Sequence, residues 1–287
     1  MTKADKYLIE DIKNILENGT KDIDPRPKYE DGTPAHTYFV THRLRTYDLS
    51  KDEFPICTLR PMAWKSAIKE MFWIFQDKSN SLKMLQDKYK SHVWDQWESK
   101  KYPDTIGTTY GYIIDKYDMF NKRVLNDIKE NPYSRYHICN MWQEGIFQSE
   151  EMDGLKPCAY ETIWSVRGEY LDMLLNQRSG DMLVASGAGG FNEIQYGALL
   201  IMVAKHCGYK PGRFSHMVVN EQIYDRHIEQ ANELIDRYEK KCIEGDEDVP
   251  KLILDTEKKD FYEFEIDDFK LENYNPVKPQ LKFDIGV

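Results

Sequence analysis

The chain has 287 residues, 41% of them hydrophobic and 13% aromatic, which is enough for a substantial core and argues against disorder. Its formal net charge of -10 argues against non-specific nucleic-acid binding, because phosphate affinity requires clustered Lys and Arg. A few local arginines can still bind a small anionic ligand. No uninterrupted apolar run of about 18 residues occurs, so we expect no membrane span, and the charged, amphipathic start lacks a signal core.

The cysteines are odd in number, widely spaced and without a C-x-x-C pair: Cys57, Cys139, Cys158, Cys207 and Cys242. This pattern argues against a disulfide framework or a structural zinc site. We therefore expect no metal and a reducing, cytoplasmic setting.

The first quarter of the chain alternates helical, turn-rich and extended segments. Apolar residues recur at helical spacing over residues 5–18, which predicts a helix. Residues 20–35 are polar and rich in Pro and Gly, which predicts a loop, and 36–48, "HTYFVTHRLRTYD", read as a strand. Residues 61–75, "PMAWKSAIKEMFWIF", form the clearest amphipathic helix of the chain.

Short β-branched and aromatic runs follow in the middle of the chain. We expect strands over 135–142, "RYHICNMW", and over 160–166, "YETIWSV". The second run is predicted to pair with residues 170–179, "YLDMLLNQRS", in a hairpin that turns through Arg167 and Gly168.

The last third predicts two helices and two strands. Residues 194–208 are apolar nearly all round, which indicates a buried helix, and 220–241 form an amphipathic one. Strands are expected within 251–255 and 261–271. Strands and helices interleave without regular βαβ alternation or G-x-G-x-x-G, so residues 1–287 are expected to form a single α+β layered domain.

Cys158 lies in "LKPCAYETIW", directly after a proline and ahead of the expected strand. A buried small residue is the usual role of a lone cysteine, whereas a nucleophile requires partners that stabilise its thiolate. The segment "NQRSGD" follows 20 residues later with Arg178, Ser179 and Asp181. If the hairpin pairs as expected, Arg178 is near enough to lower the Cys158 pKa and to bind a phosphate. On these residues alone both interpretations stay open.

Nine segments in order decide in favour of the nucleophile: "DGTPAHT", "WKSAIKEMFWIF", "VWDQW", "IGTTYG", "NPYSRYHI", "LKPCAYETIW", "QRSGDM", "FNEIQYGALL" and "IYDRHIEQ". In order and spacing they resemble the thymidylate synthase family over nearly the whole chain. The resemblance implies an α+β fold with a large mixed sheet flanked by helices. It also implies reductive methylation of dUMP to dTMP, with methylenetetrahydrofolate as carbon and hydride donor and no metal.

The resemblance also implies four catalytic residues. Cys158 matches the cysteine that adds to carbon 6 of the uracil ring, and Tyr110 the tyrosine linked to removal of the carbon 5 proton. Glu70 matches a glutamate that relays protons, although helical periodicity places it off the apolar stripe. Asn192 matches the asparagine that reads the uracil edge, where an amide both donates and accepts.

Binding residues are carried over in the same way. Arg178, Ser179, Tyr224 and Asp181 match positions that contact dUMP on the same subunit. Arg135 matches an arginine contributed by the partner subunit, which implies a homodimer with shared sites. The folate positions are Trp94, Trp97, Asp181, Phe191 and the C-terminal Val287.

The chain also departs from the family's pattern. Ala159 replaces the usual histidine after the cysteine, and Tyr136 replaces the second arginine of an Arg-Arg pair. Asn220 and Gln222 stand in the usual Asp-x-His, where Gln222 is still able to donate and accept at the ribose. The early phosphate-loop arginine is absent from its usual place, and Arg26 is the candidate substitute. The loop "VASGAGGFN" is longer and richer in glycine than is usual.

Two other functions remain to be weighed. A deoxyuridylate hydroxymethylase would use the same folate but quench the exocyclic methylene with water. Trp94 and a tail ending in Val287 favour the synthase, because water exclusion separates the two outcomes. A protein that binds nucleotide without turning it over would not require Cys158, Glu70, Tyr110 and Asn192 together.

Overall fold

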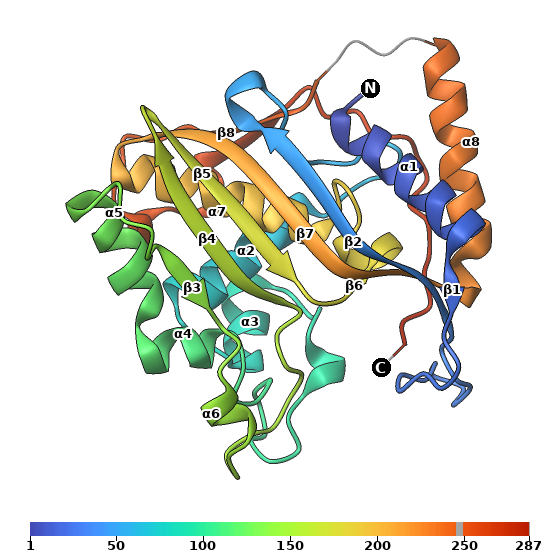
Figure 1. The fold of residues 1–287 in the computed structure, drawn as a ribbon, viewed down its shortest axis with the longest axis horizontal. Coiled ribbons are helices and arrows are strands. Elements are labelled where there is room, and N and C mark those ends of the chain that lie inside the picture. Colours follow the sequence, from blue (N-terminus) through green and yellow to red (C-terminus); the bar gives the residue numbers. More distant parts are fainter. Residues whose placement is uncertain (245–248, 287) are drawn as a thin grey trace.

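A computed structural model describes residues 1–244 and 249–286 (Figure 1). A large sheet forms the centre of the molecule, with α2 (Trp64–Met71) and α7 (Phe191–Cys207) behind it in this view. The front face of the sheet carries no helix among the described residues. Helices α1 (Lys3–Asn18) and α8 (Ile228–Glu244) lie side by side at one edge.

The sheet is mixed, as expected. Its order is β1 (Thr20–Lys21), β2 (Thr37–Asp48), β7 (Lys210–Tyr224), β5 (Tyr170–Gln177), β4 (Ala159–Arg167) and β3 (Ile138–Asn140), with β6 (Gly180–Asp181) also paired to β7. Strand β7 runs parallel to β5 and β6, and the other neighbours are antiparallel. Strands β8 (Lys251–Leu254) and β9 (Phe269–Glu272) form a separate two-stranded sheet.

The remaining helices are short. Three lie toward the end of the sheet where Cys158 precedes β4: α3 (Leu82–Tyr89), α4 (Gly111–Tyr117) and α6 (Glu144–Phe147). Helix α5 (Asp127–Glu130) lies near the C-terminal end of α7, where Lys129 Nζ is 2.8 Å from His206 Nε2. Helix α7 is buried along most of its length and ends at Gly208 with φ of +80°, a conformation that glycine adopts without strain. No helix among the described residues is long and apolar enough to cross a membrane.

Most of the predicted elements are confirmed. The helices over 5–18 and 194–208 correspond to α1 and α7, and the strand over 36–48 to β2. The predicted hairpin is the β4–β5 pair, which turns at Gly168 with φ of +61°.

Two predictions in the last third of the chain are confirmed for only part of their ranges. The helix expected over 220–241 begins only at Ile228, because residues 210–224 form β7, which pairs with β2 along its length. Helical spacing was present in the sequence, but pairing with a distant strand overrides local propensity. Within 261–271 only the last residues are extended, since Phe261–Glu263 form a 3₁₀ turn before β9.

Candidate active site

Cys158 and Arg178 are adjacent because they flank the paired ends of β4 and β5. The backbone N–H of Arg178 donates to the Cys158 carbonyl at 2.9 Å. Arg178 Nε and Nη2 donate to the carbonyls of Pro157 and Lys156 at 3.0 and 2.8 Å. Arg178 therefore fixes the backbone that leads into the half-buried thiol, and the proximity expected from the hairpin is confirmed.

The environment of the thiol opposes ionisation more than expected. Burial raises the pKa of Cys158, while the positive charges of Arg178 and Arg26 lower it. Arg178 thus acts in the expected direction, but the cost of desolvating a thiolate outweighs it. In this structure the balance of these effects favours the thiol over the thiolate.

Tyr110 supports the same segment from the start of α4. Its hydroxyl oxygen accepts the backbone N–H of Cys158 at 3.0 Å, so its own proton is free to donate into the site. Burial raises the pKa of Tyr110 well above its ordinary value, which keeps the phenol neutral. Its φ of +45° is unusual for a residue with a side chain, and such strained positions often occur at functional sites.

Glu70 is buried, with only 6% of its surface exposed, although it lies off the apolar stripe of α2. The face that carries it packs toward α7. Burial raises the pKa of Glu70 to about 7, while hydrogen bonds from Gln195 and Trp94 lower it. A carboxyl group with this pKa exchanges a proton near neutral pH, which suits acid–base catalysis.

Asn192 lies in the first turn of α7 and is held on both sides of its amide. Asn192 Nδ2 donates to Gln195 Oε1 at 2.8 Å, while Asn192 Oδ1 accepts from Ser186 Oγ at 2.9 Å and Gln177 Nε2 at 3.3 Å. Gln195 also lies close enough to Glu70 to lower its pKa, so it stands between Asn192 and Glu70. The sequence prediction missed Gln195, although its place three residues after Asn192 puts both side chains on one helix face.

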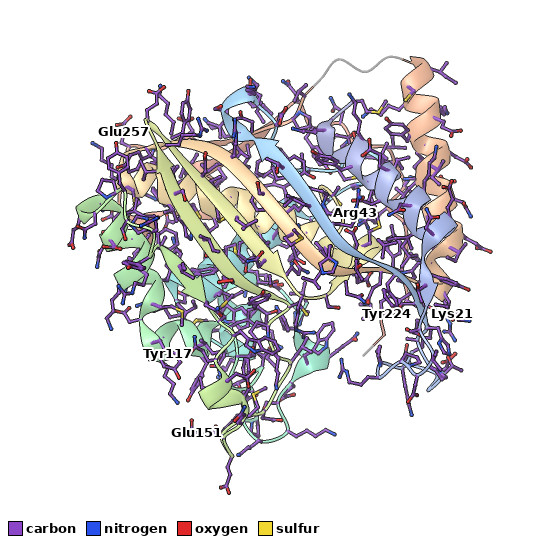
Figure 2. All side chains as sticks on the ribbon, in the orientation of Figure 1. Lys21, Arg43, Tyr117, Glu151, Tyr224 and Glu257 are labelled. Atoms are coloured by element: carbon purple, nitrogen blue, oxygen red, sulfur yellow. The ribbon has the colours of Figure 1, made fainter. Side chains whose placement is uncertain are left out.

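The predicted nucleotide residues gather at the end of β7. Tyr224 ends this strand, and Figure 2 shows its position beside the C-terminal segment. Burial raises the Tyr224 pKa to about 12, and the charge of Arg26 lowers it, so Arg26 acts on both Tyr224 and Cys158. Gln222 pairs in register with Asp181 of β6, two residues after Ser179.

Arg135 is the exception among the predicted nucleotide residues. It is exposed in the loop before β3, and no hydrogen bond or ion pair joins it to another residue in the described part of the chain. The structure of one chain therefore does not bring Arg135 into the cluster around Cys158.

Two of the predicted folate residues, Trp94 and Trp97, lie next to the cluster through Tyr110. The Trp94 and Trp97 rings meet edge to face with centroids 5.6 Å apart, and Trp94 also packs on Tyr110 at 5.3 Å. Phe191 is half-buried at the start of α7. Burial raises the pKa of Asp181 to about 7, against hydrogen bonds from the backbone and the charge of Arg60.

Arg60 is a further residue that the sequence prediction missed. It is buried, donates to the Leu183 carbonyl and lies 4.9 Å from the centroid of the Phe283 ring. Arg60 therefore joins the loop after Asp181 to the C-terminal segment. That segment continues to Gly286, where an added Cβ would lie 3.1 Å from Tyr224 Cε1. The predicted Val287 is outside the described residues.

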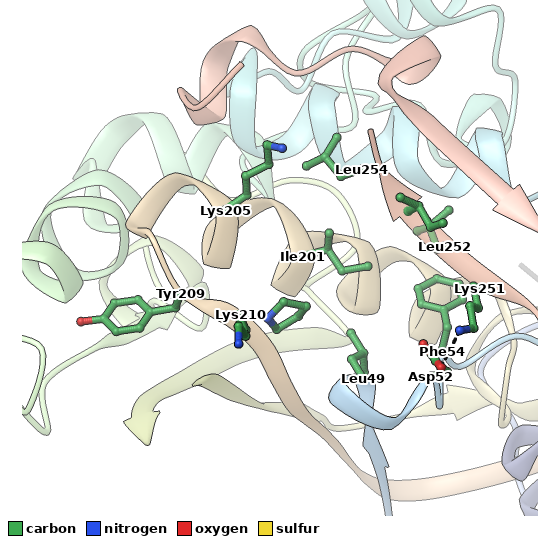
Figure 3. A pocket seen from close by; sticks show the side chains of 12 residues that line it. Leu49, Asp52, Phe54, Ile201, Lys205, Tyr209, Lys210, Lys251, Leu252 and Leu254 are labelled. Carbon is green, nitrogen blue, oxygen red and sulfur yellow. Dashed lines mark ion pairs between the residues drawn. The ribbon is translucent and has the colours of Figure 1, made fainter. Parts of the chain in front are cut away.

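A cavity of about 330 Å³ lies elsewhere, between α7, β8 and the segment after β2 (Figure 3). Its lining combines apolar side chains with lysines that have partners, such as Lys251, which pairs with Asp52 at 2.6 Å. It contains none of the predicted catalytic residues. No group of three or more His, Cys, Asp or Glu in residues 1–244 and 249–286 is placed to hold a metal ion.

A cysteine beside an arginine, a buried acid with a pKa near neutrality and a nearby side-chain amide form a combination that suits nucleophilic and acid–base catalysis. The family model for thymidylate synthase matches residues 6–287. The chain belongs to the thymidylate synthase family.

Similar proteins cover the whole chain. Thymidylate synthase of Streptococcus pneumoniae (strain 70585) is 47% identical over 292 residues and is covered completely, as is this chain. Thymidylate synthase of Streptococcus thermophilus (strain ATCC BAA-491 / LMD-9) is 45% identical over 298 residues, again with both chains covered completely. The solved structure of a thermostable thymidylate synthase A from Bacillus subtilis superposes with a TM-score of 0.86 at 36% identity, covering 99% of each chain.

Proposed function

We propose that this chain catalyses the reductive methylation of dUMP to dTMP, with methylenetetrahydrofolate as the carbon and hydride donor. Family membership over residues 6–287 supports the reaction. The observation that carries the assignment to residues is the convergence of Cys158, Glu70, Tyr110 and Asn192 at one end of the sheet. Their contacts supply a nucleophile, a proton-transfer group and a pyrimidine reader in one place.

In the proposed mechanism Cys158 Sγ adds to carbon 6 of the uracil ring, which makes carbon 5 nucleophilic. Glu70 moves a proton to and from the oxygen at carbon 4, since its pKa is about 7. Tyr110 OH orients the base, such as a water molecule, that takes the carbon 5 proton, because its oxygen accepts from the Cys158 N–H and its own proton remains available for that hydrogen bond. Tyr110 does not take the proton itself, since burial keeps the phenol neutral. Elimination of Cys158 Sγ then releases dTMP.

Phosphate and ribose binding are proposed for Arg178, Arg26, Ser179, Tyr224 and Gln222. Arg178 has two of its N–H groups committed to backbone carbonyls, so its contribution to phosphate binding comes from its charge and its remaining donors. Arg26 is exposed and supplies a second positive charge near Cys158.

The residues proposed to bind the folate fit its chemistry. Trp94, Trp97 and Phe191 offer aromatic surface to a flat pterin ring, and Asp181 offers a carboxyl group to the ring's N–H edge. The folate supplies the one-carbon unit and the hydride. Trp94 also hydrogen-bonds Glu70, so a proposed folate residue and the proton-transfer group are held together.

Incubation with dUMP and methylenetetrahydrofolate, followed by identification of both products, tests this function. Equimolar dTMP and dihydrofolate are expected. Hydroxymethyl-dUMP without dihydrofolate would instead identify a hydroxymethylase, and no turnover together with no covalent capture of fluoro-dUMP would identify a nucleotide-binding protein.

We also infer that residues 1–287 form one catalytic domain that pairs into a homodimer through the open face of the sheet. One continuous core cluster extends from α1 to β9, which supports a single domain. Side chains such as Leu44 remain exposed on β2, and Tyr133 and Tyr136 are exposed on either side of Arg135. Exposed large apolar and aromatic side chains are typical of association surfaces. Arg135 would then reach the partner's phosphate site.

Mixing two inactive variants tests the shared site. Arg135→Ala and Cys158→Ser homodimers are each expected to have little activity. After subunit exchange the mixed dimer carries one intact site, so activity is expected to return to at most about a quarter of the wild-type value for a random mixture. Absence of recovery despite exchange, or a monomeric mass by light scattering, would contradict the shared site.

A further inference from the structure

We propose that His216, a buried residue of β7 outside the reacting groups, sets the direction of the Asn192 amide and so favours uracil over cytosine nucleotides. The inference rests on the proposed function, because it concerns how that site reads its pyrimidine. It starts from a continuous chain of hydrogen bonds that joins His216 to Asn192 through Gln177 and Ser186.

The orientation of Gln177 is fixed by a backbone carbonyl. Gln177 Nε2 lies 3.0 Å from the Ser179 carbonyl oxygen, which is able only to accept, so the amide nitrogen must face it. Gln177 Oε1 then faces His216 Nε2 at 3.0 Å. His216 Nε2 must therefore carry a proton and donate it to Gln177.

The donor-to-acceptor direction of these hydrogen bonds is the same as far as Asn192. Gln177 Nε2 donates to Ser186 Oγ at 2.7 Å, which leaves the Ser186 hydroxyl to donate to Asn192 Oδ1 at 2.9 Å. On the opposite side Asn192 Nδ2 donates to Gln195 Oε1 at 2.8 Å. Every bond in the chain from His216 thus points toward the Asn192 carbonyl oxygen.

His216 is itself held in place by a buried ionic cluster. Its Nδ1 lies 3.4 Å from Arg45 Nη2 and 3.0 Å from Glu193 Oε1, whose charge Arg45 Nε offsets at 2.7 Å. Arg45 also binds Asp11 Oδ2 at 2.8 Å and the carboxylate of Glu221. Burial lowers the pKa of His216, whereas the Glu193 carboxylate raises it. Nδ1 faces a carboxylate oxygen and Nε2 faces the Gln177 amide oxygen, so the two contacts together require a proton on each ring nitrogen.

This orientation of the Asn192 amide matches the donor and acceptor pattern of uracil. Asn192 Oδ1 accepts from Ser186 at 2.9 Å and only weakly from Gln177 at 3.3 Å, so it is able to accept the N3–H of uracil in place of the weaker contact. Asn192 Nδ2 keeps one N–H for the oxygen at carbon 4. Cytosine presents an acceptor at N3 and a donor at carbon 4, so reading it requires a rotated amide. Rotation of Asn192 would place its Nδ2 donor against the Gln177 Nε2 donor and leave the Ser186 hydroxyl without its acceptor. Gln177 is not able to relieve this by rotating, because its Nε2 donor would then face the N–H of His216 and its bond to Ser179 would be lost.

Two substitutions test the contacts of the two ring nitrogens of His216 separately. Asparagine in the variant His216→Asn places an amide near the position of Nδ1 and keeps a polar partner for Glu193, but is too short to donate to Gln177. Glutamine in the variant His216→Gln reaches the place of Nε2 and restores that donor. Phe214→Leu is the packing control, because Phe214 stacks on His216 with centroids 6.1 Å apart and has no polar link to the chain of hydrogen bonds.

The measurement is the ratio of the dCMP inhibition constant to the dUMP KM, with melting temperature recorded for each variant. His216→Asn is expected to lower the ratio about tenfold or more, the effect of one misdirected hydrogen bond, whereas His216→Gln keeps it near wild type. Phe214→Leu is expected to lower stability with the ratio unchanged.

Three outcomes would overturn the inference: an unchanged ratio in His216→Asn, a lowered ratio in folded His216→Gln, or ratios that follow melting temperature in all variants, including Phe214→Leu. The ratio in His216→Asn and the ratio in His216→Gln each test the inference. If one of these two variants does not fold, the ratio in the other still decides. Failure of the wild-type enzyme to form dTMP would instead contradict the proposed function, which distinguishes the two.

Discussion

Replacing Glu70 by Gln is expected to stabilise the protein at alkaline pH while removing most of its activity. Burial raises the pKa of Glu70 from 4.5 to about 7, so the folded protein binds this proton more tightly than the unfolded chain does. Between these two values unfolding releases a proton. The stabilisation from the protonated carboxyl is complete below pH 4.5 and is lost as pH rises through about 7.

The size of the change in the free energy of unfolding follows from the shift in the Glu70 pKa. A difference of about 2.5 pKa units corresponds to about 3.4 kcal/mol at 1.36 kcal/mol per unit. Integrated from pH 5 to pH 8, the free energy of unfolding of the wild type should fall by about 2.5 kcal/mol relative to Glu70→Gln, because a glutamine does not titrate. The amide oxygen of the introduced glutamine keeps an acceptor for Trp94, so the fold is expected to be retained.

Urea denaturation at pH 5, 6, 7 and 8 measures this difference, with dTMP formation assayed on the same samples. The kcat of Glu70→Gln should fall by about 10²–10⁴, the usual contribution of a positioned acid–base group. Glu130→Gln, at an exposed position of α5, serves as the control for replacing a glutamate. A stability difference between Glu70→Gln and wild type that is equal at pH 5 and pH 8 would refute the reasoning.

Three further outcomes are expected. Cys158→Ser abolishes turnover and covalent capture of fluoro-dUMP in the presence of folate, whereas Cys242→Ser, at an exposed position, retains both; equal losses would contradict the assignment. Tyr110→Phe leaves the backbone N–H of Cys158 without its acceptor, which costs about 1–3 kcal/mol in urea denaturation and lowers kcat; an unchanged kcat would exclude a role in proton removal. Arg45→Met leaves buried carboxylates unpaired, so the free energy of unfolding should fall by about 3–5 kcal/mol, and a loss below about 1 kcal/mol would show that the cluster adds little.

The amino-acid sequence carried strong signals where neighbours along the chain decide the structure. The spacing of apolar residues in α1 and α7 and the turn between β4 and β5 depend on contacts within a few residues, so their positions were predictable. The hairpin also brought Arg178 next to Cys158 without any knowledge of the rest of the fold.

Prediction failed where a distant segment determines the structure. Residues 220–224 fit a helical pattern, but β2, about 180 residues earlier in the chain, pairs with them and makes them extended. The positive charges near Cys158 were predicted correctly, but burial raises its pKa by more than they lower it. Burial is a property of the packed chain and is not encoded by the flanking residues.

By itself the sequence determined the family and the main helices and strands and supplied the candidates for the reacting groups, because ordered motifs and local periodicity are properties of the chain. Only the tertiary structure decided that Glu70 is buried, that Gln195 stands between it and Asn192, and that His216 stands behind them. These relations join residues that are far apart in sequence, and their effects on pKa and hydrogen-bond direction arise only once packing excludes water.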